Sequence, residues 1–396
     1  MNTLYFKCLL SWACTLFICA IVSAQDSFTP KFESSTVYAG IEVGSKGVKM
    51  SLLEVGKDAK TTGSFNILKD TTVNTDFISF TQPTFQATLE GLSNLYAVAL
   101  TKYNIPSGKI FTVVSSGVKM QAEKEEKTKW IYNLVDSFRL KINEPKRQVE
   151  VVDVLQEARL SHLGIVPSAK RFATFLIDIG SGNTKGGYFP MDENTRDFKL
   201  FQLNWGTKST ANATEKRLDE YDKTLANYSK QLQRVLLGAE NGELIYAVNS
   251  SGAYNLNDYI AFSGGIAWAT ATLLRPEQAK SSVVTVSYED VQQFCEQLYS
   301  NYASLSDAAI TAGIKDESLD KNAIAKEIKR VHSVFDQRSL MAGAGLLLKI
   351  MRQFKSVYES KGFFLVKNGQ VGWVSAYVDQ SVENGNLVSG SAPVKQ

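Results

Sequence analysis

The sequence is poor in the residue types that build zinc centres, disulfide frameworks and strongly charged binding surfaces. Its 396 residues include only two histidines and four cysteines. His162 and His332 lie far apart, and no His/Cys cluster has the spacing of a zinc site, so we read both histidines as structural. A net charge of only +3 excludes a global field that would attract polyanions. We therefore expect no nucleic-acid partner, and any polyanion must bind at local patches.

Three of the four cysteines fall in an apolar segment at the N-terminus. Residues 2–24 carry one cation, Lys7, and the apolar run ends in Ile-Val-Ser-Ala before Gln25. We predict that residues 1–24 are a secretory signal cut after Ala24. An uncleaved membrane anchor is the alternative, but the run is short for a span. Cleavage leaves Cys295 alone, which predicts no disulfide, no membrane span after signal removal, and a location in a bacterial periplasm or outside the cell.

A glycine-rich stretch, FATFLIDIGSGNTKGGYF at residues 172–189, gives the chain its clearest chemical signal. A buried strand leads to Asp178, and small residues follow that allow a tight turn with backbone N–H groups free for an anion. These residues are Gly180, Ser181, Gly182, Asn183 and Thr184. A carboxylate followed by such a turn suits a phosphate and a hydrated Mg²⁺. Alone, the stretch is more consistent with an ordinary Gly-rich β-hairpin, because isolated glycine motifs are weak signals.

A second copy of this pattern, VYAGIEVGSKGVKMSLLEV at residues 37–55, makes coincidence a poor explanation. It has the acidic residue Glu42 and a turn of Gly44, Ser45, Lys46 and Gly47. A chain of 396 residues with 44% apolar content is long enough for two domains. Strands that alternate with helices predict an α/β fold.

The paired loops resemble the phosphate-1 and phosphate-2 loops of the actin, sugar-kinase and heat-shock-chaperone ATPase superfamily. Within it, the chain most resembles the exopolyphosphatase and guanosine pentaphosphate phosphatase family, and the similarity runs from about residue 37 to about residue 355. Four further segments match family motifs in order, namely VVSSGVK (113–119), EVVDVLQEARLSHLGI (150–165), FQLNWGTKST (201–210) and YIAFSGGIAWATATLL (259–274). The resemblance implies two ribonuclease H-like (actin-like ATPase) domains with an interdomain cleft.

The resulting domain plan divides the chain into five parts. After the signal peptide (1–24) we expect a disordered lead-in (25–35). Domain I (36–170) carries the first loop. Domain II (171–380) carries the second loop, a Gly-Gly turn, C-terminal helices and a β-hairpin around Asn368-Gly369. A flexible tail (381–396) ends the chain.

The resemblance also implies roles for individual residues. Glu42 and Asp178 would hold Mg²⁺, mostly through water, and Glu157 would orient and deprotonate the attacking water. Without that context, the triplet Glu157-Ala-Arg would read as an exposed helix start. Lys119, where the family has Arg, would neutralise a phosphate. The amides of both loops would cradle phosphates, and Ser263, Gly264 and Gly265 would form the turn on the substrate or nucleotide side.

The chain departs from the family pattern close to these residues. Glu42 replaces Asp, Lys46 replaces Asn, Lys185 replaces Glu, and Leu155 and Gln156 replace acidic residues. Such changes are expected to weaken turnover or to alter the substrate. The first loop is also similar to the G-S-x-G-x-R loop of secreted nucleoside triphosphate diphosphohydrolases.

Three functions therefore stay open at this point. The leading hypothesis is a secreted, Mg²⁺-dependent phosphoanhydride hydrolase that releases terminal phosphate from polyphosphate or a related substrate. The second is an extracellular, apyrase-like hydrolase of nucleoside tri- and diphosphates. The third is a catalytically weak module that binds or senses a phosphorylated ligand. The expected partner is polyphosphate or a nucleotide, and the sequence leaves the oligomeric state open, a homodimer included.

Overall fold

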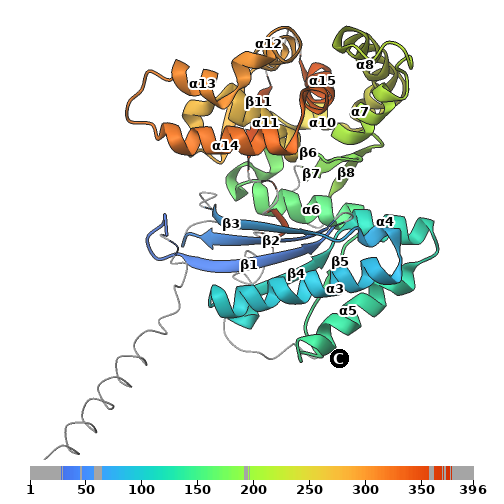
Figure 1. Cartoon of the computed structure of the whole chain (residues 1–396), viewed down its shortest axis with the longest axis vertical. Helices are drawn as coiled ribbons and strands as arrows, with labels where there is room; N and C mark the ends of the chain where they lie inside the picture. Colours follow the sequence, from blue (N-terminus) through green and yellow to red (C-terminus); the bar gives the residue numbers. More distant parts are fainter. Residues whose placement is uncertain are drawn as a thin grey trace, which may run out of the picture.

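The protein consists of two α/β halves with helix α6 (Val154–Ile165) between them, as the computed structural model shows (Figure 1). The structure describes residues 28, 30–44, 47–57, 65–190, 195, 197–355, 361–367, 369, 372–374 and 376. The predicted signal peptide and the predicted tail after residue 380 lie outside these ranges. None of the described helices is both long enough and apolar enough to cross a membrane.

The first half is a five-stranded mixed sheet in the order β3-β2-β1-β4-β5. The first three strands form an antiparallel meander, and β4 and β5 continue the sheet in parallel. The strands are β1 (Thr36–Val43), β2 (Gly47–Val55), β3 (Phe65–Asn74), β4 (Ile110–Val114) and β5 (Glu150–Val151). Helices α3 (Gln82–Ala97), α4 (Ser116–Lys124) and α5 (Thr128–Lys141) complete this half. Their apolar faces and one face of the sheet share a single buried core.

The second half repeats this topology and adds one strand. Its sheet has the order β10-β11-β9-β6-β7-β8, so β8-β7-β6-β9-β11 corresponds to β3-β2-β1-β4-β5 in order and in strand direction. The strands are β6 (Thr174–Ile179), β7 (Thr184–Tyr188), β8 (Lys199–Leu203), β9 (Tyr259–Ser263), β10 (Val283–Val286) and β11 (Gly362–Val366). The repeat places the two glycine loops at equivalent positions, each between the first and second strand of its sheet.

Helices surround the second sheet more heavily than the first. They are α7 (Thr207–Glu215), α8 (Leu225–Ala239), α9 (Ile245–Ser251), α10 (Ala253–Leu256), α11 (Gly265–Leu274), α12 (Tyr288–Ser300), α13 (Asp307–Gly313), α14 (Lys321–Val334) and α15 (Gln337–Phe354). The last two are the predicted C-terminal helices. Helix α15 has more buried residues than any other described helix, ten of its eighteen, and it contacts α7, α8, α11 and α12. This helical layer holds α7 in place behind the second loop.

The predicted β-hairpin around Asn368-Gly369 is wrong in its second half. Strand β11 forms its first arm, but both edges of β11 are already paired, with β9 and with β10. No edge is left for a returning strand, and residues 372–374 and 376 are helical instead. Trp373 and Val374 are buried in a cluster with Tyr38 and Leu160. This segment therefore packs against the first sheet and α6.

The predicted disorder of the lead-in (25–35) is also corrected, because its later residues are tied to the first sheet. The carboxylate of Glu54 is buried and accepts hydrogen bonds from the backbone N–H groups of Lys31 (2.9 Å) and Phe32 (2.8 Å). A buried carboxylate needs such donors, and these bonds keep the pKa of Glu54 below its usual value despite burial. Phe28 packs against Tyr103 with ring centroids 5.1 Å apart.

Candidate functional site

The two glycine loops close in the same way in the folded protein. In the first, the N–H of Gly44 donates to the carbonyl of Gly47 at 2.9 Å; in the second, the N–H of Gly180 donates to the carbonyl of Asn183 at 3.0 Å. Each is thus a four-residue turn between antiparallel strands. Ser45 and Lys46 of the first turn lie outside the described residues. The repeat that the sequence predicts is therefore present in the backbone.

The register of each hairpin places a lysine directly opposite the strand-end carboxylate. Glu42 pairs across the strands with Lys49, and Asp178 pairs with Lys185. Side chains of directly opposed residues project from the same face of a sheet and interact. Lys49 is exposed, whereas the side chain of Lys185 is only 14% exposed.

Glu157 lies between the two halves and is held from both sides. Its Oε2 accepts a 2.9 Å hydrogen bond from the backbone N–H of Ser116, at the start of α4 in the first half. Its Oε1 accepts from Nζ of Lys185, on β7 in the second half, at 2.5 Å. The side chain is 17% exposed. A helix N-terminus and an ammonium each stabilise a carboxylate in its charged form.

This pairing fixes the charge state of Glu157 and Lys185. Burial raises the pKa of Glu157, but the Lys185 ammonium and the bonds from Lys185 and Ser116 outweigh it, so the pKa lies below the usual value. Burial lowers the pKa of Lys185, but Glu157, Asp178 and Glu42 together raise it above the usual value. Both groups are therefore ionised at neutral pH.

The other two carboxylates behave in the opposite way. Burial raises the pKa of Glu42, an effect that Lys49 partly offsets and Glu157 increases. Burial also raises the pKa of Asp178, where Lys185 is the main opposing influence. Three carboxylates are thus close enough to affect one another, and among the described residues Glu157 alone has an ammonium within hydrogen-bond distance. Perturbed groups that gather in this way are typical of functional sites.

The predicted Gly-Gly turn reaches the second carboxylate. Oγ of Ser263 donates to Oδ1 of Asp178 at 3.0 Å, as the register of β6 and β9 requires. Gly264 has φ +95°, and a Cβ there would lie 2.3 Å from the carbonyl oxygen of Ile179 and 3.0 Å from Oδ1 of Asp178. Only glycine fits this close approach. Gly265 begins helix α11.

The side chains of two residues predicted to bind phosphate have partners within the protein, although the prediction for Thr184 concerned its backbone N–H. Lys119 lies on α4 one turn after Ser116, and its Nζ is 3.7 Å from Oε1 of Glu123 on the same helix. The hydroxyl of Thr184 donates to the carbonyl of Trp205 at 2.7 Å. Gly182 has open space around it, with no atom within 4 Å of a Cβ built there. The open side of the second loop is therefore at Gly182.

The start of helix α7 supports the second loop. This contact was not predicted from the sequence. The N–H groups of Thr207 and Lys208 donate to the carbonyls of Gly180 (2.9 Å) and Ser181 (2.8 Å). A Cβ on Gly206 would lie 2.6 Å from the carbonyl oxygen of Gly180, so a side chain there would push the loop away. Lys185 and Ser116 were likewise missed as site residues. The hairpin register was the available signal for Lys185, because a four-residue turn after Ile179 places it opposite Asp178.

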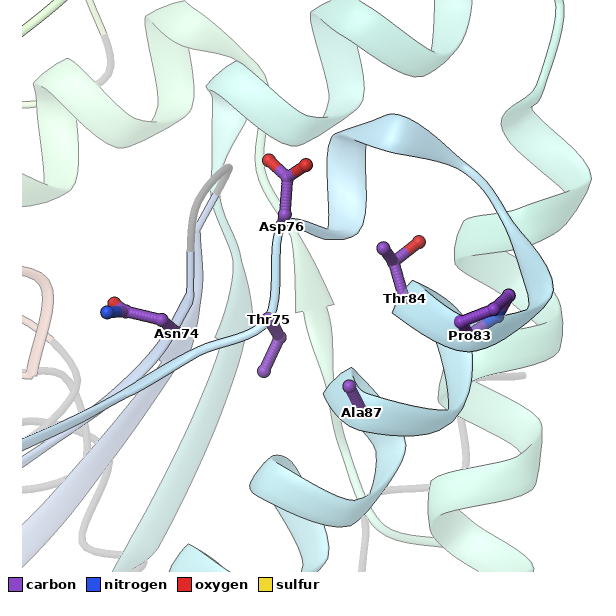
Figure 2. Close-up of a pocket in the computed structure, with 6 residues that line it drawn as sticks. All are labelled: Asn74, Thr75, Asp76, Pro83, Thr84 and Ala87. Atoms are coloured by element: carbon purple, nitrogen blue, oxygen red, sulfur yellow. The ribbon is translucent and has the colours of Figure 1, made fainter.

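An open hollow lies beside the first loop (Figure 2). It is formed by the end of β3 and the start of α3, and Asn74 pairs with Gly47 of the loop. Its lining residues are Asn74, Thr75, Asp76, Pro83, Thr84 and Ala87. The hollow is lined mainly by small and uncharged groups, and none of these residues was predicted.

The described residues do not form a ready-made metal cage. No group of three or more His, Cys, Asp or Glu side chains in the described part of the chain is arranged to hold a metal ion. Both oxygens of Glu157 already accept hydrogen bonds, and one oxygen of Asp178 does. Mg²⁺ usually keeps several waters and binds through one or two carboxylates. The ammonium of Lys185 already occupies Glu157, so the residues do not fit a Mg²⁺ ligated by Glu157, and binding through water at Glu42 and Asp178 stays a prediction.

Comparison with known proteins identifies the architecture. No family model matches the sequence, and no curated protein matches it. Solved structures do. The Aquifex aeolicus member of the Ppx/GppA family superposes with a TM-score of 0.55 at 14% identity, over 88% of this chain and 99% of that chain. The protein has the Ppx/GppA fold.

Two further structures agree with the Ppx/GppA fold. An exopolyphosphatase from Cytophaga hutchinsonii matches with a TM-score of 0.51 at 13% identity, over 88% of this chain and 98% of that chain. An exopolyphosphatase-like protein matches with a TM-score of 0.53 at 15% identity, over 88% of this chain and 100% of that chain. The predicted class, two actin-like, ribonuclease H-like α/β domains, is confirmed. At these identities the likeness establishes the fold, and the activity is a separate question.

Proposed function

We propose that this protein is a phosphoanhydride hydrolase of exopolyphosphatase type, which releases terminal phosphate from polyphosphate or a related chain. The observation that carries the proposal is the placement of Glu157. It is fixed between a helix N-terminus and Lys185, and it is electrostatically coupled to the two carboxylates, Glu42 and Asp178, that adjoin the glycine loops. The Ppx/GppA fold supports the substrate class.

The reaction needs one water and one oriented carboxylate. The water oxygen attacks the terminal phosphorus, the P–O bond to the bridging oxygen breaks, and the water proton passes to Glu157 and then to solvent. Each oxygen of Glu157 has a second lone pair that can accept this hydrogen bond. Phosphoryl transfer has a loose transition state and depends on positioning more than on base strength, so the lowered pKa of Glu157 is compatible with turnover. The open side of the second loop, at Gly182, offers backbone donors for phosphate oxygens.

The proposal is tested by phosphate release from a substrate panel. Purified protein is incubated with long-chain polyphosphate, short-chain polyphosphate, ATP and ADP, with and without Mg²⁺, in ¹⁸O-labelled water. We expect release from polyphosphate, with one ¹⁸O in each released phosphate, and little release from the nucleotides. Glu157→Gln is expected to lose about 10²–10⁴-fold in rate, the usual contribution of general-base catalysis. The matched control, Lys199→Gln, changes an exposed residue of β8 and should retain the full rate.

Other results select the alternatives. Faster release from ATP than from polyphosphate would favour the apyrase-like reading, which rests on the sequence of the first loop. Ligand-induced thermal stabilisation without turnover would favour the binding module, and the lowered basicity of Glu157 is the observation behind it.

Secretion is part of the proposal and rests on residues 1–24. If the signal is cut after Ala24, the N-terminal residue of the exported protein is Gln25. Mass spectrometry of protein recovered from outside the cytoplasm tests this, and an intact Met1 would contradict it.

A further inference from the structure

We infer that, contrary to the Mg²⁺ predicted from the sequence, the ammonium of Lys185 takes the place of a divalent cation in this site, so that the resting protein binds no divalent metal ion between its two loops. The inference deepens the proposed function, but the test below needs no substrate and no turnover. It rests on the position of Lys185, on the engagement of the surrounding oxygens, and on the distribution of charge.

The position follows from the backbone. Lys185 is directly opposite Asp178 in the β6–β7 register, and its Nζ lies 2.5 Å from Oε1 of Glu157. Its side chain is 14% exposed and that of Glu157 is 17% exposed. The lysine is thus largely buried, bonded to Glu157 and placed opposite Asp178 in the sheet.

The surrounding oxygens leave little for a metal ion. Glu157 accepts from Ser116 and from Lys185, and Asp178 accepts from Ser263. Hard cations such as Mg²⁺ and Mn²⁺ bind through carboxylate, carbonyl and water oxygens. A cation entering here would have to displace the lysine from Glu157, or share the carboxylates with it.

The charges oppose a second cation. Among the described residues, Glu157, Asp178 and Glu42 act electrostatically on Lys185, and Lys49 lies across from Glu42. These five described groups carry three negative and two positive charges, a net charge of −1 before any metal ion binds. A divalent ion would overshoot that charge and would sit close to a fixed ammonium in a partly buried site, where repulsion is poorly screened.

A glutamate in place of Lys185 would remove one positive charge from the site and add a fourth carboxylate. The single substitution Lys185→Glu therefore converts a site filled by an ammonium into one that demands a cation. Lys185→Gln removes the ammonium without adding charge.

Binding of Mn²⁺ without substrate tests the inference directly. The full chain is titrated with Mn²⁺, and the free ion is followed by its electron paramagnetic resonance signal. We expect the wild type and the control Lys199→Gln to leave the signal of about 0.1 mM Mn²⁺ unchanged. This concentration does not exceed the dissociation constants of weak divalent-cation sites, roughly 10⁻⁴–10⁻³ M. Lys185→Glu is expected to bind one Mn²⁺ at least tenfold more tightly, and to gain thermal stability when Mn²⁺ is added.

The remaining outcomes are also decisive. If Lys185→Glu does not fold, Lys185→Gln must still bind Mn²⁺ more tightly than the wild type. The inference is overturned if the wild type binds Mn²⁺ as tightly as either variant and loses that binding in Asp178→Asn. If no phosphate is released from any substrate, the proposed function fails while the Mn²⁺ titration still decides this inference.

Discussion

The two glycine hairpins have the same backbone structure but differ in the environment of the lysine opposite the strand-end carboxylate. Both turns are closed by the same hydrogen bond, and both registers set a lysine opposite the strand-end carboxylate. Lys49 is exposed to solvent, whereas Lys185 is buried and paired with Glu157. The hairpin register therefore determines the position of each lysine in its strand, and the surrounding packing determines whether the lysine is buried and which group it pairs with.

Helix α6 is the cause of the difference. It packs on β7 of the second sheet and brings Glu157 over Lys185. Its first turn also delivers the same carboxylate to the N-terminus of α4 in the first half. One side chain thus links both halves, and it does so at the second hairpin only.

The largest expected difference between the two hairpins is in the stability lost when the lysine of each is replaced. Lys185→Met leaves a buried carboxylate without its ammonium, which typically costs about 3–5 kcal/mol in the free energy of unfolding. Lys49→Met changes an exposed side chain and should stay within about 0.5 kcal/mol of the wild type. Urea unfolding of both variants measures the difference. The double variant Lys185→Met/Glu157→Gln should recover part of the stability that Lys185→Met loses. Equal losses in Lys185→Met and Lys49→Met would show that packing does not distinguish the two hairpins.

A smaller effect is expected from the glycines that contact each turn. In Gly206→Ala the new Cβ would lie 2.6 Å from the carbonyl oxygen of Gly180. In Gly44→Ala the new Cβ would lie 3.3 Å from the carbonyl oxygen of Gly47. Overpacking of the first kind costs about 1–3 kcal/mol. We expect Gly206→Ala to lower the thermal midpoint clearly more than Gly44→Ala does. The opposite order would mean that α7 does not support the second turn.

The smallest effect concerns the two strand-end carboxylates and depends on pH. Burial raises the pKa of Glu42 and of Asp178, so the folded state holds these protons more tightly than the unfolded chain does. Stability is therefore lost as the pH rises through the raised pKa values, beginning near the ordinary value of about 4. Glu42→Gln and Asp178→Asn avoid this loss and should gain about 0.5–2 kcal/mol at pH 7.

Unfolding measured at several pH values checks the sign. The gain should shrink as the pH falls below about 4, where the wild-type carboxylates are protonated in both states. A gain that is the same at pH 3 and pH 7 would show that charge burial is not its source.

Much of the fold could be predicted from the sequence, because the glycine turns, the buried strands and their repeat are local signals. The same holds for the place of Asp178, Ser263 and Gly264, which the strand order brings together. The role of Lys185 could not be predicted, because it depends on α6, a neighbour in space. The prediction for the C-terminal segment was wrong for a similar reason. Asn368-Gly369 is a good hairpin signal, but both edges of β11 were already occupied by distant strands.

The proposed role of Glu157 in orienting the attacking water is tested by the rate of phosphate release. The initial rate of phosphate release from long-chain polyphosphate at pH 7 is compared for the wild type and Glu157→Gln, with both confirmed as folded by their unfolding curves. We expect the variant to keep at most about 1% of the wild-type rate. A variant that releases phosphate as fast as the wild type would contradict it.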